Sequence, residues 1–80
     1  MYKVYILYSS RINKYYVGHT ENLELRLDRH NQGSSKFTSQ TNDWQIVYSE
    51  DYLTKGDAMK RENEIKKKKS RKYIEELVTQ

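Results

Sequence analysis

The stretch from Val4 to Tyr8 constrains the fold most, because an extended chain with this pattern is apolar on both faces. Val4, Ile6 and Tyr8 alternate with Tyr5 and Leu7, and residues two positions apart lie on the same face of a strand. The pattern therefore predicts that this stretch is a central strand of a sheet.

The other elements follow from periodicity and from turn residues. Polar turn residues at 9–13 predict a hairpin between the first strand and a second strand at 14–18. The later elements are expected to be a helix at about 21–31, a loop at 36–43, a strand at 44–50, a helix at about 55–68 and a third helix after residue 70.

Short polar residues mark where these helices begin and end. Thr20, Thr54 and Ser70 are the expected N-caps, because a side-chain hydroxyl accepts a hydrogen bond from a free backbone N–H at a helix start. Gly33 is expected to stop the first helix within the segment 32–35.

The resulting order, ββαβαα, predicts the fold class. It is an α/β protein of the α+β kind, with a three-stranded, mainly antiparallel sheet flanked by helices. The 80 residues are expected to form one domain, 1–80. A chain of this size buries about 60–65% of its unfolded surface, so its core is thin.

Composition excludes several classes of protein. The chain has no cysteine, which excludes disulfides and thiolate metal sites. No apolar run approaches the roughly 18 residues that a membrane-spanning helix needs, and the N-terminus lacks the pattern of a secretory signal. The expected location is the cytoplasm, with no membrane association.

The positive charge is concentrated near the C-terminus. The chain has a net charge of +4, but the segment 60–72 alone carries +6, which leaves −2 elsewhere. Such a patch attracts phosphate backbones, although it could equally be a solvated helix end. The basic residues expected to contact nucleic acid are Lys66, Lys67, Lys68, Lys69, Arg71 and Lys72.

Three charged or titratable residues share helix faces with apolar ones. Arg26 and His30 lie on the stripe of two leucines in the first helix, and Glu62 lies between Ala58 and Ile65 in the second. A half-buried charge needs a partner or a metal. Arg26 and Glu62 could therefore simply pair, and His30 could be an ordinary helix-end histidine.

Four short segments carry a resemblance to a known family. They are Lys3-Val4-Tyr5, Tyr16-Val17-Gly18, Asn22 to Asn31, and Arg61-Glu62-Asn63. In this order and spacing they resemble the GIY-YIG nuclease superfamily, especially its small single-domain members, over nearly the whole chain to about residue 75. The fold of that family, a three-stranded antiparallel sheet with flanking helices, agrees with the order predicted above.

The resemblance implies a one-metal phosphodiesterase. Glu62 would hold a single Mg²⁺ or Mn²⁺, with waters and phosphate oxygens as its other ligands. Arg26 would neutralise charge on the phosphoryl oxygens. Tyr5 would orient the attacking water, and would act as general base if a nearby cation lowers its pKa.

The same resemblance implies supporting roles for four further residues. Tyr16 would assist Tyr5 from the adjacent strand, and His30 would contact the phosphate or transfer a proton. His19 occupies a position that can have a similar role. Gly18 would let the hairpin backbone turn tightly beside the site. The tyrosines could also be ordinary core or sheet residues.

Three functions remain open from the sequence. The leading hypothesis is a metal-dependent endonuclease that acts on DNA in preference to RNA. Whether a protein partner supplies its specificity is left open by the sequence. The second is a non-catalytic nucleic-acid-binding module that uses the segment 60–72. The third is a protein-interaction domain whose basic patch meets an acidic partner. A carboxylate at Glu62 favours the enzyme, because a pure binder gains little from a negative charge facing a polyanion.

Overall fold

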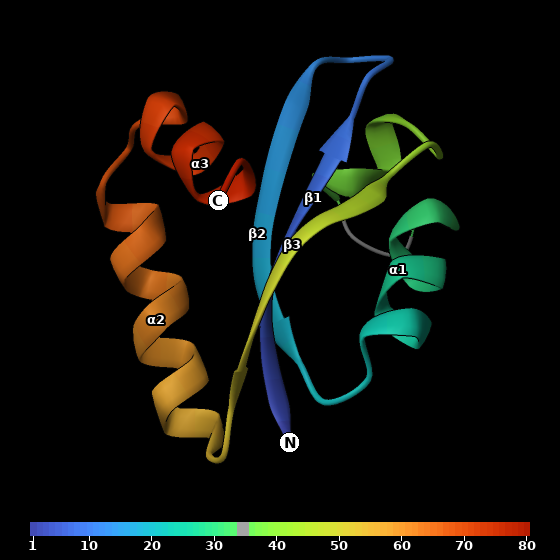
Figure 1. Ribbon diagram of the computed structural model, residues 1–80. Coiled ribbons are helices and arrows are strands. Elements are labelled where there is room, and N and C mark those ends of the chain that lie inside the picture. The colour runs from blue at the N-terminus through green and yellow to red at the C-terminus, as the bar shows by residue number, and fades with distance from the viewer. Residues whose placement is uncertain (34–35) are drawn as a thin grey trace.

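A computed structural model describes residues 1–33 and 36–80 (Figure 1). Its elements are β1 Tyr2–Ser9, β2 Lys14–Thr20, α1 Leu23–Asn31, the short 3-10 helix η1 Thr38–Gln40, β3 Gln45–Tyr52, α2 Lys55–Lys67 and α3 Arg71–Val78. The predicted order and the α+β class are confirmed. The sheet has the order β2-β1-β3 and both pairings are antiparallel.

Strand β1 is central, as its two apolar faces predicted. It pairs with β2 on one side and with β3 on the other, and Tyr5 lies opposite Gly18 of β2. A register shift in the β1–β3 ladder occurs between Ile6 and Leu7. In the described part of the chain β2 pairs with β1 alone, so its outer edge has no strand partner there.

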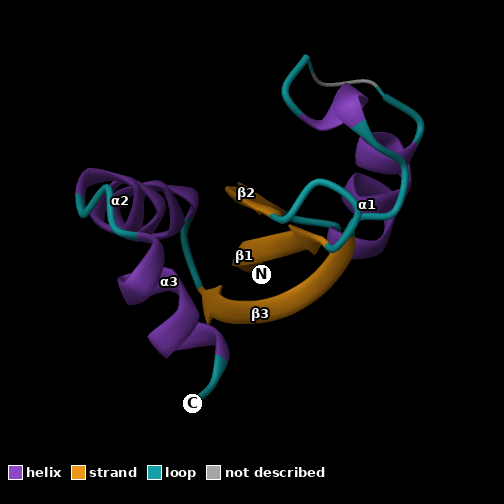
Figure 2. Cartoon of the chain, turned by 90° about the horizontal axis from the view of Figure 1, so that it is seen from above, coloured by secondary structure: helices purple, strands orange, loops and turns teal. Residues whose placement is uncertain are grey.

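Helices cover both faces of the sheet. Figure 2 shows α2 and α3 on one side and α1 with η1 on the other. Strand alternation separates the core into two clusters, one for each face. Tyr5 and Leu7 pack with Trp44 on the α1 side, and Leu23 and Leu27 are partly buried against them.

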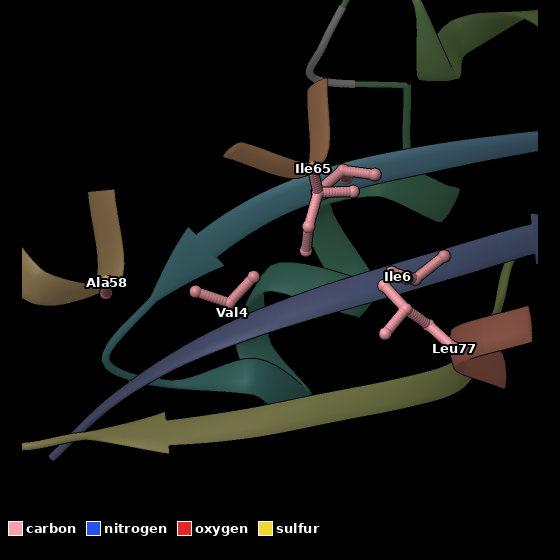
Figure 3. Packing of buried hydrophobic residues seen from close by; sticks show 6 residues of the cluster. Val4, Ile6, Ala58, Ile65 and Leu77 are labelled. Atoms are coloured by element: carbon pink, nitrogen blue, oxygen red, sulfur yellow. The ribbon is translucent and has the colours of Figure 1, made fainter. Parts of the chain in front are cut away.

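The second cluster fills the face covered by α2 and α3. Val4 and Ile6 of β1 pack with Ala58 and Ile65 of α2 and with Leu77 of α3 (Figure 3). These five residues are at most 6% exposed. Each of the two helices is apolar on one face and charged on the other. The apolar faces of α2 and α3 therefore pack against the sheet, and the charged faces point to solvent.

The caps were predicted correctly for two helices and incorrectly for the first. The side chains of Thr54 and Ser70 accept backbone hydrogen bonds at the starts of α2 and α3. In α1 the cap is Asn22, whose side chain accepts from the Leu25 N–H at 3.1 Å. Thr20 instead accepts from the Asn22 N–H, so it orients the turn and the helix begins two residues later than predicted.

The end of α1 follows the prediction at Gly33. Its φ of +82° is in the left-handed region that glycine adopts without steric cost. Ser34 and Ser35, which belong to the same predicted stop, lie outside the described residues.

The third strand differs from its predicted bounds of 44–50. Trp44 precedes the strand and is 2% exposed, and its indole N–H donates to the Thr38 carbonyl at 2.9 Å. The strand continues to Tyr52, because Lys3 pairs with Asp51 and Tyr2 lies opposite Tyr52. Within 1–33 and 36–80, no helix has the length and apolar character needed to cross a membrane.

We expect Ile65→Ala to lower the free energy of unfolding by about 2–5 kcal/mol, since it removes buried methylenes and leaves a cavity. Ile65 is 1% exposed, whereas Met59 in the same helix is 44% exposed. Urea denaturation of Ile65→Ala and of the control Met59→Ala measures the difference. Equal losses in the two variants would contradict this description of the core.

Candidate active site

The Tyr5 side chain lies across the neighbouring strand. It is 1% exposed, and its hydroxyl shares a hydrogen bond of 2.9 Å with Nε2 of His30. The other ring nitrogen, Nδ1, lies 2.9 Å from the hydroxyl of Thr38, which is itself buried. β1, α1 and η1 are thereby joined by one buried chain of hydrogen bonds.

Gly18 makes room for this tyrosine. A Cβ atom built at residue 18 would lie 2.6 Å from the Tyr5 hydroxyl oxygen and 2.7 Å from Cζ. No real side chain tolerates such distances, so the glycine is required by the close approach of the tyrosine and not by an unusual φ. The expectation of a tight backbone turn at Gly18 is wrong, because the residue lies inside β2, paired with Tyr5.

The burial of Tyr5 and His30 keeps both groups neutral. Burial raises the pKa of Tyr5 well above its usual value, with a further contribution from Tyr16, while Arg26 opposes the shift. Burial, followed by the charge of Arg26, lowers the pKa of His30 below 6.5. Tyr5 in this environment becomes a general base only if an additional cation lowers its pKa.

Tyr16 completes the aromatic part of the site. Its ring centroid lies 6.3 Å from that of Tyr5 and 4.8 Å from the imidazole of His30. It is half-buried in the edge strand β2, whereas Tyr5 in the central strand is 1% exposed.

Glu62 reaches the same strand from α2. Its Oε1 lies 2.5 Å from Nδ1 of His19, and its Oε2 accepts from the ammonium of Lys66. Burial acts to raise the pKa of this carboxyl, but the hydrogen bonds from Lys66 and His19 lower it below its usual value. Glu62 is therefore an ionised, half-buried carboxylate, as the helical stripe predicted.

The simple alternative, an Arg26–Glu62 ion pair, is not what forms. Among the ion pairs of the described residues, Glu62 pairs with His19 and Lys66. The neighbouring Arg61 has a structural role instead, since it donates to both carboxylate oxygens of Glu50 in β3.

Arg26 and His19 meet in a cavity of about 340 Å³ between the end of β2, α1 and the start of α2. Arg29 and Lys55 also line it, and the sequence analysis missed both. For Arg29 a signal existed, because it follows Arg26 by three residues and shares its helix face. Lys55 had none, since it comes from a segment 29 positions after Arg26.

These groups come together around the outer edge of β2. Tyr5, Tyr16 and His30 lie on the α1 face of the sheet, while His19 and Glu62 lie on the α2 face. A strand partner on that edge would separate the two sets. Figure 2 shows β2 at the end of the sheet, with α1 on one side and α2 on the other.

The donor set around Glu62 fits a hard divalent cation held by one carboxylate. Among the described residues, no three His, Cys, Asp or Glu side chains cluster as metal ligands, which is unlike a closed zinc site. Mg²⁺ usually retains several waters and binds through one or two carboxylates plus substrate phosphates. An ionised Glu62 near a cationic cavity offers that chemistry.

The basic residues of the segment 60–72 are distributed over different surfaces. Lys66 and Lys69 face the outer edge of β2, together with Arg71, which lies 5.0 Å from the Tyr15 ring centroid. Lys67 lies on another side of α2, beside Met59 and Asn63. The ammonium of Lys68 lies 5.3 Å from the ring centroid of Tyr73, and Lys72 is exposed on α3.

The chain is similar to known proteins over nearly its whole length. A family model described as the GIY-YIG catalytic domain matches residues 1–74. The UPF0213 protein SH2523 of Staphylococcus haemolyticus is 39% identical over 77 residues, covering 91% of this chain and 93% of that protein. A UPF0213 protein of Staphylococcus aureus is 40% identical over 52 residues, or 64% of this chain and 63% of that protein. The solution NMR structure of the UPF0213 protein BH0048 from Bacillus halodurans has 31% identity and a TM-score of 0.59, covering 99% of this chain and 84% of that one.

We expect Gly18→Ala to displace Tyr5 and to lower the free energy of unfolding by about 1–3 kcal/mol, the usual cost of overpacking. The matched control is Gly56→Ala in the first turn of α2, where an added Cβ meets no atom within 4 Å. There the substitution is expected to stabilise the protein slightly. Chemical denaturation distinguishes the two, and a neutral Gly18→Ala variant would contradict the close approach of Tyr5.

We expect His30 to make the protein less stable in mild acid. Its pKa is lowered from 6.5 on folding, so the unfolded chain binds more protons below that pH. The free energy of unfolding then falls as the pH drops below about 6.5, by up to about 1.4 kcal/mol per pH unit.

The control for this prediction is His30→Gln, which does not titrate. Denaturation at about pH 7 and about pH 5.5 should show a smaller loss for the variant than for the parent. An equal loss of stability in both proteins would show that the titration of His30 does not cause the acid sensitivity.

Proposed function

Because the chain belongs to the GIY-YIG catalytic domain family, we propose that it is a nuclease that hydrolyses phosphodiester bonds in DNA, in preference to RNA. The observation that carries the proposal is the meeting of a half-buried carboxylate, tyrosine hydroxyls, imidazoles and a guanidinium at one strand edge. Phosphodiester hydrolysis requires these kinds of group: a metal ligand, proton-transfer groups and a cation for the phosphate.

Glu62 is the proposed ligand of one Mg²⁺ or Mn²⁺. Such a cation, when bound, supplies Lewis-acid polarisation of the scissile phosphate and stabilises the leaving oxygen. The carboxylate is already ionised and held in one orientation by His19. His19 thus acts as a positioning residue, in addition to lining the cavity in which a phosphate would lie.

Arg26 is proposed to contact the phosphoryl oxygens. It lines the cavity together with Arg29 and Lys55, and these three cations outnumber the one carboxylate among the described lining residues, that of Glu21. Their positive charge favours entry of a phosphate and stabilises the additional negative charge of the transition state. Arg29 and Lys55 are therefore proposed binding residues.

Tyr5 is proposed to orient the attacking water, and Tyr16 to assist it. His30 and Thr38 fix the direction of the Tyr5 hydroxyl through the buried hydrogen bonds. His30 is proposed to accept the Tyr5 hydroxyl proton at Nε2 as that hydroxyl takes a proton from the attacking water, so that the proton ends on an imidazolium and Tyr5 stays neutral. Fixed orientation is the main advantage of such a buried relay.

The alternative of a non-catalytic binding module does not account for Glu62. A carboxylate kept ionised at the edge of a basic surface reduces the attraction for a polyanion, whereas a metal enzyme depends on it. We therefore place the binding module second.

We expect Glu62→Gln to lower the cleavage rate by about 100-fold or more, because Lewis-acid stabilisation is worth several kcal/mol. Binding to DNA in the presence of a chelator should be retained, since the basic residues are unchanged. The control is Glu64→Gln, which alters an exposed carboxylate two positions away in the same helix. Plasmid nicking with Mg²⁺ or Mn²⁺ measures the rates, and unchanged cleavage by Glu62→Gln would refute the one-metal proposal.

A further inference from the structure

A second hollow follows the same outer edge of β2, toward the start of the strand. It is a groove of about 600 Å³ between the strand, the end of α2 and the beginning of α3. Val17, Ile65 and Ile74 contribute apolar side chains to it. Among the described residues, neither Glu62 nor Arg26 lines this groove, and Tyr16 is the one candidate catalytic residue that does.

Aromatic rings line the groove. Tyr15 and Tyr16 come from β2, and Phe37 comes from the segment before η1. Phe37 is 39% exposed, and its ring centroid lies 5.7 Å from that of Tyr16 with the planes 30° apart. A ring with this exposure is accessible to a ligand, and the Tyr16 ring beside it extends the aromatic surface.

Four cations surround these rings: Lys14, Lys66, Lys69 and Arg71. No acidic residue is among the described residues that line the groove. Lys66 and Arg71 are engaged with Glu62 and Glu75. Within the described part of the chain, no ion pair holds Lys14 or Lys69, and the Lys14 ammonium lies 5.9 Å from the Phe37 ring centroid.

We propose that this groove binds an unpaired nucleotide of a DNA strand, next to the phosphate held at the candidate active site. The inference rests on the proposed nuclease function and specifies its substrate class as DNA with a single-stranded segment. Stacking of bases on aromatic side chains, combined with cations along the backbone, is how proteins bind single strands without reading sequence.

The chemistry of the groove favours a nucleotide over other occupants. A base has two flat apolar faces and a phosphate on each side, which matches aromatic rings enclosed by cations. The base faces of an intact duplex are stacked and therefore inaccessible to these rings. An acidic peptide would use the cations but would leave the aromatic rings without a matching surface.

The position of Tyr16 relates the groove to the cleavage site. The tyrosine lines the groove and also contacts His30, with ring centroids 4.8 Å apart. A nucleotide in the groove is therefore adjacent to the phosphate between Arg26 and Glu62, along a single strand edge. The preferred substrate is a duplex with an unpaired tail or flap that begins near the scissile bond.

The test compares the binding of blunt and tailed DNA. Fluorescence anisotropy is measured in chelator with a duplex of about 15 base pairs, the same duplex with a tail of about four nucleotides at either end, and a tail of abasic residues. We expect one tail to increase affinity about fivefold or more, and the abasic tail to lose most of this gain.

Variants then assign the effect to the groove. Phe37→Leu keeps an apolar side chain but removes a π face, and should abolish most of the preference for tailed DNA. Lys69→Gln should reduce that preference. For tailed DNA, it should also lower the magnitude of the slope of log binding constant against log salt concentration by about 0.7. Lys67→Gln removes the same charge outside the groove, and should weaken blunt and tailed DNA alike. Unfolding free energies of all variants confirm that they fold.

The outcomes separate this inference from the proposed function. Metal-dependent cleavage by the parent without any preference for tails would overturn the groove proposal and leave the nuclease intact. Equal effects of Lys69→Gln and Lys67→Gln on the tail preference would also overturn it. A tail preference that depends on Phe37 and Lys69 supports the groove, even if the parent cleaves no DNA and the nuclease proposal fails.

Discussion

The structure depends on one constraint: within residues 1–33 and 36–80, no strand pairs with the outer edge of β2. Strand alternation places neighbouring side chains on opposite faces of a sheet, which would separate Tyr16 from His19 permanently in an interior strand. At a free edge the two faces meet, so Glu62 from α2 and Arg26 from α1 approach the same strand from opposite layers. Sheet edges invite aggregation unless they are protected, and here the basic residues of α2 and α3 border this edge.

The buried hydrogen bonds of the α1 face depend on the contact between Tyr5 and Gly18. A buried tyrosine needs a partner for its hydroxyl, and His30 supplies one only because the ring can extend over the strand at the glycine. Thr38 then holds the imidazole from the other side. The core of the α1 face and the candidate proton-transfer groups are therefore the same set of atoms, and a substitution in this set affects stability and chemistry together.

The sequence allowed most of the fold and part of the candidate site to be predicted. The double apolar pattern of β1, the caps Thr54 and Ser70 and the helical stripe with Glu62 are local signals, and each was confirmed in the structure. The competition between Thr20 and Asn22 for the cap of α1 was not decided by residue type, because both are good caps. It depends on the backbone conformation of the turn, with Asn22 extended at φ −130°.

Long-range partners were the least predictable part. The pairing of Glu62 with His19 joins residues 43 positions apart, and nothing in the spacing of either residue indicates the other. The groove is similar, since four separate segments of the chain contribute to it. Periodicity assigns a side chain to a face, but only the packing of the elements determines what it meets there.

The thin core explains why the charged groups occupy an edge. A carboxylate in the interior of so small a domain would lose several kcal/mol of hydration, which few neighbours could replace. At the surface, solvent would screen its interaction with a ligand. Glu62 is at an intermediate depth, with 13% of its side chain exposed and both oxygens hydrogen-bonded. This depth keeps the carboxylate ionised and fixed while leaving it within reach of a substrate, a combination that the centre of a three-stranded sheet cannot provide.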